Sequence, residues 1–566
     1  MKRNQFINSL VFLLLVICLF GCKKSDESFD QVLMLNTDYL VVTGKSNTYS
    51  FDLLANQDIT LSTDVDWIYF ETAQLTKGKH AVKFTTKTND DEERSGIITI
   101  QTTPDVSREI LVVQEAGLVN IFYVKTNGTG NGRSWNEATN LNTALQNATS
   151  GSVIHLAEGI YIPTKTLTNG EPSNLGDNTF EINKNISLIG GYPANATEGT
   201  AADPQIHKTI LSGKQTDGAT SFHVVTISAP TANNEKVVIE GITIQDGVAT
   251  DRGISITVNG NQFSRGNGGG MIIGGSNVLL KHVEIIDNKA DAHAGTAGQC
   301  AGLYVFGDAQ VEMRNCKVNQ NRNENNNGGG LWVSESKAYI FDSEMNNNYA
   351  KGTASGVHAY PNAVIYMYNS SIQNNNNTSF GAGIYARQNS DIFLVNCLIT
   401  GNATTSANGG GGVMLYDNCT ANIISCTISA NATPGPGGGV YRRQNTNKLT
   451  LTNSIVSGNI QRSSSTDVDA YETTAEGPAI KSSILTSKVY NSAGMEITGA
   501  TFNPNQMFDS EFHLIGTDNP AQTHGMTAAE LQPVSQSYTP ALSEEILSDI
   551  HGISRVDKPT MGALVN

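Results

Sequence analysis

Charged residues are scarce in this chain of 566 residues, at 16% of the total, and basic residues are scarcer still. There are 36 lysines and arginines against 52 aspartates and glutamates, so the formal net charge at pH 7 is −16. The acidic residues are spread along the whole chain. A protein that binds nucleic acid needs a basic face, so we exclude nucleic acid as the expected partner.

Cysteine is also scarce, with seven in the chain. The C-x-x-C spacing that is typical of zinc and redox sites does not occur. Cys316, Cys397 and Cys426 occupy equivalent positions in a repeated pattern, where a free cysteine acts as a small apolar residue. We therefore predict no essential disulfide, and we assign no metal site and no cofactor.

Apolar runs long enough to span a bilayer are missing, because the run at residues 10–20 is too short. It follows Lys2 and Arg3, as in a targeting segment. The motif at its end, Leu19-Phe20-Gly21-Cys22, resembles the lipobox of bacterial lipoproteins. That resemblance implies a signal peptide at residues 1–21, lipidation of Cys22 and a tether at residues 22–30. An ordinary cleaved signal with a chance cysteine is the alternative.

The tether begins Lys23-Lys24-Ser25-Asp26-Glu27-Ser28. Its acidic, serine-containing part is similar to the surface-export signal of Bacteroidetes lipoproteins. The similarity implies a lipid-anchored protein of the outer membrane that faces the cell exterior. The outer membrane would then be one partner, held through several acyl chains.

Glycine, in contrast, is abundant, with 55 residues, and residues 268–459 repeat themselves. Each unit opens with small residues and closes with an asparagine, and successive closing residues are 33, 27, 27, 27, 29 and 28 positions apart. The closing residues are Asn288, Asn321, Asn348, Asn375, Asn402, Asn431 and Asn459. A near-constant period of this length is the mark of stacked repeats.

Apolar residues alternate inside each unit, which predicts strands rather than helices. Each unit is therefore expected to be one coil of short strands, and stacking of the coils buries a shared core. We expect the closing asparagine to adopt left-handed backbone at a turn. We also expect its amide to bond the same amide in the next coil. A column of small residues five positions earlier should point inward: Cys316, Ser343, Ser370, Cys397, Cys426 and Ser454.

The repeat resembles the right-handed parallel β-helix of the pectate-lyase-like superfamily, and especially bacterial surface repeats of the GGG-I-Y … N-C-x-I-x-x-N type. We assign residues 118–508 to the β-helix and residues 509–566 to its C-terminal cap. The run Gly128-Thr129-Gly130-Asn131-Gly132-Arg133-Ser134-Trp135 is similar to the opening of such proteins. Apolar residues at helical spacing from Leu141 predict a short helix over the open N-terminal end. The long loop at residues 193–208 is expected to protrude sideways.

Residues 31–117 have a different pattern, with short alternating strands between turn residues, which predicts a β-sandwich. Three runs, at residues 64–68, 94–100 and 110–114, resemble the BACON domain, an immunoglobulin-like module of Bacteroidetes surface proteins. The resemblance implies either carbohydrate association or a spacer. We interpret Trp67 as a core residue rather than a sugar platform. The predicted fold class is all-β, with an immunoglobulin-like β-sandwich followed by a right-handed parallel β-helix.

The strand after each pair of small residues points its second and fourth residues outward under the period-two rule. The second positions are Ile272, Tyr304, Trp332, His358, Tyr385, Met414 and Tyr441, and the fourth are Gly274, Phe306, Ser334, Tyr360, Arg387, Tyr416 and Arg443. Since coils stack about 4.8 Å apart, these residues should form two adjacent columns on one face. An exposed aromatic face of this size indicates a binding surface.

Three functions follow from that face. In the first, polysaccharide or host glycan stacks on the aromatic rings of Tyr304, Phe306, Trp332, Tyr385, Tyr416 and Tyr441. In the second, the protein is a polysaccharide lyase for an acidic glycan, with His358, Tyr360, Arg387 and Arg443 as base and cations. A hydrolase is disfavoured, because it needs two carboxylates about 5–9 Å apart and the columns hold none.

The third possibility is a non-catalytic adhesin or structural surface protein. Aromatic residues are favoured in strands and stack between neighbouring strands for stability alone. The aromatic columns are therefore compatible with a purely structural role, and the sequence leaves the three functions open.

Overall fold

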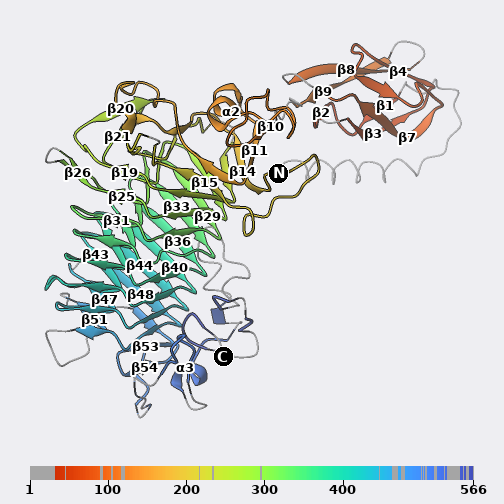
Figure 1. The fold of residues 1–566 in the computed structure, drawn as a ribbon. Helices are drawn as coiled ribbons and strands as arrows, with labels where there is room; N and C mark the ends of the chain where they lie inside the picture. Colours follow the sequence, from red (N-terminus) through yellow and green to blue (C-terminus); the bar gives the residue numbers. More distant parts are fainter. Residues whose placement is uncertain are drawn as a thin grey trace, which may run out of the picture. The chain divides into compact units, whose positions relative to one another are not determined.

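A computed structural model describes residues 32–44, 46–89, 93–102, 106–115, 121–215, 217–231, 235–293, 296–444, 446–461, 469–472, 479–498, 500, 503, 507–515, 519–527, 530–531, 549–551, 553–555 and 560–564. The chain forms two compact units, Met1–Val119 and Asn120–Asn566 (Figure 1). The signal peptide, Cys22 and the tether lie outside the described residues. In the described part of the chain, no helix has the length and apolar character needed to cross a membrane.

The first unit is a β-sandwich of two sheets. The four-stranded sheet has the order β1 (Leu33–Leu35), β3 (Asn47–Ala55), β7 (Gly78–Thr86), β5 (Ile68–Phe70), and the five-stranded sheet the order β2 (Tyr39–Val42), β9 (Val106–Gln114), β8 (Arg94–Thr102), β4 (Ile59–Thr63), β6 (Gln74–Leu75). Neighbouring strands are antiparallel except β2 and β9. Burial alternates along the strands, so one face of each sheet builds the core.

Trp67 belongs to that core, with 4% of its surface exposed. The guanidinium of Arg94 lies 4.7 Å from the centre of its ring. These contacts confirm the interpretation of Trp67 as a core residue.

The second unit is a solenoid of stacked coils (Figure 1). Sheet I holds the twelve strands β10 (Ile121–Val124), β11 (Val153–Ala157), β14 (Ser187–Tyr192), β17 (Val237–Glu240), β23 (Asn277–Lys281), β29 (Gln310–Arg314), β33 (Lys337–Phe341), β36 (Val364–Tyr368), β40 (Asp391–Val395), β44 (Thr420–Ile424), β48 (Lys448–Thr452) and β52 (Ala479–Lys481). Sheet II holds the ten strands β13 (Phe180–Ile182), β16 (Val225–Ile227), β22 (Met271–Gly274), β28 (Leu303–Phe306), β32 (Leu331–Val333), β35 (Val357–Ala359), β39 (Ile384–Arg387), β43 (Val413–Tyr416), β47 (Val440–Arg442) and β51 (Ala470–Glu472).

Two further faces complete each coil. Sheet III consists of β12 (Gly159–Tyr161), β15 (Thr209–Ser212), β18 (Ile242–Gln245), β24 (Glu284–Ile286) and β30 (Lys317–Asn319), followed by β37 (Ser371–Gln373), β41 (Leu398–Thr400), β45 (Thr427–Ser429), β49 (Ile455–Val456), β53 (Ser483–Leu485) and the antiparallel β54 (Lys488–Tyr490). Sheet IV has two-residue strands: β19 (Val248–Ala249), β25 (Lys289–Ala290), β31 (Arg322–Asn323), β34 (Tyr349–Ala350), β38 (Asn376–Asn377), β42 (Ala403–Thr404), β46 (Ala432–Thr433) and β50 (Ile460–Gln461). Two hairpins project from the coils, β20 (Ser255–Val258) with β21 (Asn261–Ser264), and β26 (Ala292–His293) with β27 (Thr296–Ala297).

Strands that are one coil apart pair in parallel and in register. Leu331 pairs with Val357, 26 residues further on, and Val357 pairs with Ile384, 27 residues further on. This confirms that side chains a whole coil apart in sequence are neighbours in space. The inward residues of the coils join one continuous core that runs from Val124 to Val456.

Side-chain columns tie each coil to the next. The amide Nδ2 of each closing asparagine donates to the Oδ1 of the following one, at 2.8–3.2 Å, from Asn288 as far as Asn459. Asp469 then accepts from Asn459 at 2.7 Å. The predicted amide ladder is confirmed, and its members are buried.

The predicted left-handed backbone of the closing asparagine is wrong. The residue before each of them has the positive φ: Asp287, Gln320, Asn347, Asn374, Gly401, Ala430 and Gly458. Because the turn is made one residue earlier, the backbone N–H and the side chain of the asparagine both reach the next Oδ1.

The column of small residues points inward as predicted, and all six residues are buried. The column is also a second ladder, because the Cys316 N–H donates to the hydroxyl of Ser343, and the Ser343 N–H to that of Ser370. The five described cysteines are free and buried.

The two ends of the solenoid are covered differently. Helix α2 (Leu141–Asn147) buries Leu141 and Ala144 against the first coils, as predicted, and the side chain of Asn140 caps its N-terminus. A 3-10 turn, η1 (Leu175–Asp177), lies in the loop that leads to β13. At the other end, an isolated antiparallel bridge joins Phe508 and Leu514 in the segment predicted as the C-terminal cap.

The C-terminal segment contains α3 (Pro520–Thr523) and folds back along the late coils. The fully buried Arg555 donates to the carbonyl oxygens of Thr560 and Gly562, and the Ala563 N–H donates to the hydroxyl of Thr427. These contacts attach the end of the chain to the side of the solenoid.

We predict that Asn375→Ala lowers the free energy of unfolding by about 2–4 kcal/mol. The substitution removes the acceptor of Asn348 Nδ2 and the donor to Met345 O, and each buried group left unpaired costs roughly 1–3 kcal/mol. Urea denaturation followed by circular dichroism measures the change. The neighbouring exposed Asn376, changed to Ala, is the control and is expected to stay within about 0.5 kcal/mol. An equal loss of unfolding free energy in both variants would contradict the conclusion that the amide ladder stabilises the β-helix.

Candidate functional site

The predicted second-position column exists in register on sheet II. Ile272, Tyr304, Trp332, His358, Tyr385, Met414 and Tyr441 pair in that order. Its expected exposure is wrong. Trp332 and His358 are each 3% exposed, Tyr385 1% and Tyr441 6%, and only Tyr304 is half-buried.

The cover comes from the turn that precedes each strand of sheet II. This turn crosses the outer side of the column, and the residue four positions before each second-position residue is left-handed. It is a glycine in five coils, and it is Cys300 before Tyr304 and Ala354 before His358. A Cβ added at Gly381 would lie 2.6 Å from the Cβ of Tyr385, and one added at Gly437 would lie 2.5 Å from that of Tyr441. The side chains do face away from the central core, but the next layer of chain seals them.

The cover differs along the column. Tyr385, Met414 and Tyr441 form a separate apolar cluster against Phe380 and Ala354. At the other end, Tyr304 and Phe306 pack under the β20–β21 hairpin, where the ring of Phe263 lies 5.2 Å from that of Phe306. Of the six predicted substrate-binding residues, Tyr304, Phe306 and Tyr416 are half-buried. Of these three, Tyr416 is the one whose ring stacks with an arginine, Arg387.

His358 lies inside this aromatic column. Its ring centre is 4.1 Å from that of Trp332, 5.2 Å from that of Tyr385 and 5.5 Å from that of Tyr360. Neither ring nitrogen has a hydrogen-bond partner among the described residues. Burial, with a smaller effect of the Arg387 charge, lowers the pKa of His358 to about 3. The imidazole is therefore neutral and shielded, which is an unfavourable position for a general base.

The fourth-position column is more open. Tyr360, Arg387, Tyr416 and Arg443 are all half-buried, and we call them the Tyr–Arg ladder. The guanidinium of Arg387 lies 5.0 Å from the ring centre of Tyr360 and 5.6 Å from that of Tyr416. Arg443 lies 5.0 Å from the ring centre of Tyr416 on the next coil. The strands thus bring three of the four predicted catalytic residues together in one cation–aromatic stack.

Positive charge is concentrated in this ladder. Within the described ranges, Arg387 makes no ion pair with a carboxylate, and its Nε is buried without a hydrogen-bond partner. The chain as a whole carries an excess of acidic residues. Two guanidinium groups on one strip of such a protein give it a local excess of positive charge.

Sheet I carries an aromatic column that the sequence analysis missed. The rings of Tyr339 and Tyr366 stack at 5.2 Å and 3°, and those of Tyr366 and Phe393 at 4.6 Å and 9°. All three are half-buried. The period-two rule applied to the second strand of each coil would have found them. Because their faces cover one another, only ring edges are open between the coils, and the stack is better suited to stability than to sugar stacking.

Comparison with known proteins defines the class of the second unit. Residues 301–475 match the sequence family described as "Right handed beta helix region". This range contains the strands from β28 to β51, so the solenoid is a right-handed parallel β-helix and the fold class is all-β, as predicted. No curated protein sequence is detectably similar to the chain.

Two solved structures show a distant likeness. One is the pectate lyase Pel9A, with 12% identity and a TM-score of 0.38 over 70% of this chain and 88% of that one. The other is the Bacteroides ovatus GH5 xyloglucanase in complex with a XXXG heptasaccharide, with 12% identity and a TM-score of 0.16. The match to the xyloglucanase covers 28% of this chain and less than half, 45%, of that enzyme.

We predict that His358 makes the protein less stable in mild acid. An unfolded histidine binds a proton below about pH 6.5, whereas His358 stays neutral in the folded protein down to about pH 3. The unfolded state therefore binds more protons in this window, and stability falls as the pH falls. Between pH 7 and pH 5 the contribution of His358 is about 2 kcal/mol, and His358→Phe should remove it.

Urea denaturation at the two pH values measures this difference. Exposed His551, changed to Phe, is the control and should leave the pH dependence as it is. His223 is also buried, with its pKa lowered to about 4, and keeps its own contribution in every variant. An unchanged pH dependence in His358→Phe would mean that solvent reaches the imidazole in the folded protein, as a catalytic base would require.

Proposed function

We propose that this protein is a cell-surface lipoprotein that binds an acidic polysaccharide along the Tyr–Arg ladder of its β-helix. The observation that carries the proposal is the half-buried guanidinium of Arg387, which is stacked between two tyrosine rings and has no carboxylate partner among the described residues. A charge held in this way is available for an anionic ligand.

The stacking prepares Arg387 for such a ligand. A guanidinium group is planar and carries its N–H donors around its edge, so rings on its two faces do not cover that edge. The rings also restrict the side chain, which reduces the entropy lost on binding. A carboxylate can then accept two parallel hydrogen bonds from one arginine.

The spacing favours a polymer over a small anion. Arg387 and Arg443 are two coils apart along the solenoid. Neighbouring strands lie about 4.8 Å apart, so the two charges are separated by about 10 Å along the axis. A chain that carries anionic groups at a regular interval can engage both arginines at once, and the second contact is then intramolecular.

Binding is favoured over a lyase reaction by the place of His358. A lyase needs a base that reaches the proton beside the uronate carboxylate. The imidazole lies under the ring of Tyr360 and is shielded from the open side of the ladder. Because the arginines of the ladder have no accessible base beside them, the site is better suited to binding an acidic polysaccharide than to cleaving it.

We predict that Arg387→Ala weakens binding of polygalacturonate or alginate at least tenfold, or about 1.4 kcal/mol. Isothermal titration calorimetry measures the affinity, which should also fall as salt is raised. Arg322→Ala is the matched control, since Arg322 also lies on an aromatic ring, that of Tyr349, but is paired with Glu324 on sheet IV.

Unchanged affinity in Arg387→Ala, or an equal loss in Arg322→Ala, would reject the ladder as the binding site. Ultraviolet absorbance of the same polymers after incubation tests the lyase alternative. An unsaturated product that is formed by the natural protein and lost in Arg387→Ala would show catalysis in place of simple binding.

We also predict that Cys22→Ser releases the protein from the membrane fraction, because the anchoring acyl chains can no longer be attached. Fractionation and metabolic labelling with a fatty acid measure the change, and Cys18→Ser is the control within the signal segment. Protease added to whole cells should degrade the natural protein if it faces the exterior. Protection from protease in intact cells would contradict surface exposure.

A further inference from the structure

A candidate site separate from the Tyr–Arg ladder lies at the first coils, near β10 and β11, at the other end of the solenoid from β43 and β47 (Figure 1). Two cavities of about 600 and 570 Å³ adjoin there and share residues 126–129 as a common wall. Both volumes fall in the range of small-ligand sites, about 300–1,000 Å³. The Tyr–Arg ladder contributes no residue to either cavity.

The shared wall belongs to the glycine-rich run between Lys125 and Trp135, and this run is held by backbone hydrogen bonds. The Gly130 N–H donates to Ala138 O at 2.9 Å, and the Gly132 N–H donates to Glu137 O at 2.6 Å. A Cβ at Gly130 would lie 2.3 Å from the Glu137 carbonyl oxygen, so only glycine permits this approach. The larger cavity is therefore formed before any ligand binds.

Its floor and far side come from other segments. Trp135 is 4% exposed, and its ring packs 5.0 Å from Tyr123 and 5.1 Å from Tyr192. Ala157 and Ala194 also line the cavity, and their short side chains leave it open.

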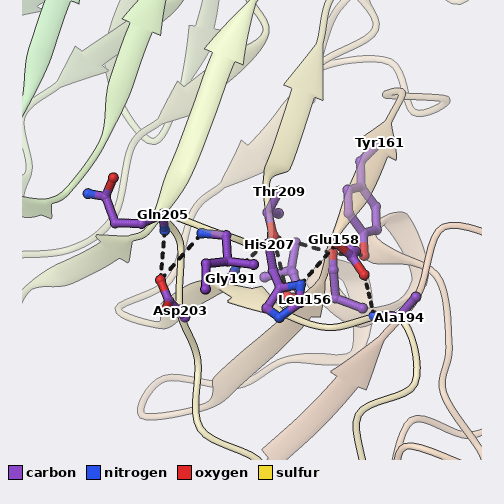
Figure 2. Close-up of polar contacts among 11 residues, drawn as sticks. Leu156, Glu158, Tyr161, Gly191, Ala194, Asp203, Gln205, His207 and Thr209 are labelled. Atoms are coloured by element: carbon purple, nitrogen blue, oxygen red, sulfur yellow. Dashed lines mark hydrogen bonds and ion pairs between the residues drawn. The ribbon is translucent and has the colours of Figure 1, made fainter.

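Glu158 lines the same side of the larger cavity as Ala194. Figure 2 shows its carboxylate between Ala194 and His207. One oxygen accepts from the Ala194 N–H at 2.9 Å, and the other lies 3.0 Å from His207 Nδ1. These bonds, led by that of Ala194, hold the pKa of Glu158 below its usual value. Glu158 thus fastens the 193–208 loop beside the cavity and acts as a positioning residue.

The rim of the larger cavity consists of polar side chains that can bind a ligand. Asn127, Asn136 and Glu137 are exposed, and in the part of the chain that the structure describes their side chains make no hydrogen bond or ion pair. Amides and a carboxylate offer both donors and acceptors, as sugar hydroxyls require. The lining contains one basic residue, Lys125, and two acidic residues, Glu137 and Glu158. The cavity therefore carries one excess negative charge, which disfavours an anionic ligand.

We propose that the larger cavity binds a short neutral saccharide, with Trp135 as its floor and Asn127, Asn136 and Glu137 as its hydroxyl-binding rim. This site differs from the Tyr–Arg ladder in place and in charge, and it does not depend on the binding of an acidic polymer there.

The three tryptophans of the chain allow a selective test. In the double variant Trp67→Phe/Trp332→Phe, Trp135 is the only indole left, and its fluorescence reports on the cavity floor. We expect a saturable change on titration with at least one of the neutral disaccharides cellobiose, xylobiose, mannobiose and maltose. Adding Asn136→Ala with Glu137→Gln should weaken that binding at least tenfold. Glu284→Gln, an exchange near Lys208 and Lys317, is the control and should leave binding unchanged.

The proposal is overturned if none of the four disaccharides gives saturable binding, or if the rim variant binds as well as its parent. Trp67 and Trp332 are both buried, so calorimetry on the natural sequence with the rim substitutions repeats the test without altering them. Arg387→Ala should leave disaccharide binding intact. Loss of binding in that variant would reject a separate site, whereas failure of polygalacturonate binding alone would reject only the ladder.

Discussion

The amide ladder of the closing asparagines is the interaction on which the rest of the β-helix depends. Each asparagine uses its carbonyl oxygen for two donors of the preceding coil and its amide for an oxygen of the next. These bonds lie in a buried column, where a polar group without a partner lowers the stability of the fold. A slip in register between coils is therefore strongly disfavoured. The register in turn places every other outward column, including the Tyr–Arg ladder.

The turns between sheet IV and sheet II then decide which columns meet solvent. A left-handed residue, glycine in most coils and Ala354 before His358, lets the turn fold closely over the second-position side chain, and an apolar second layer forms outside the central core. The four residues of the Tyr–Arg ladder lie beyond this cover and stay half-buried. The same turn therefore shields His358 and leaves Arg387 available, and this is the physical basis for favouring anion recognition over catalysis.

The two proposed sites divide the ligand chemistry by charge. The ladder joins two guanidinium groups about 10 Å apart along the axis and suits a repeating anion. The cavity beside Trp135 has a slight excess of negative charge and free polar side chains, and it suits a neutral saccharide. The aromatic stack of Tyr339, Tyr366 and Phe393 has neither property, because its ring faces are used between coils.

The sequence alone determined the coil, its period and the register. Strict alternation makes each segment a strand, and the repeated asparagine and small residues can be satisfied only by the equivalent residue one coil away. It also identified Arg387 and Tyr416 as neighbours. It did not determine exposure, because period two separates the two faces of a strand but does not show whether another segment covers the outer one. That decision belonged to the tertiary structure: the turn at Gly381 lies over Tyr385, and segments far apart in sequence meet around Trp135 to form a cavity.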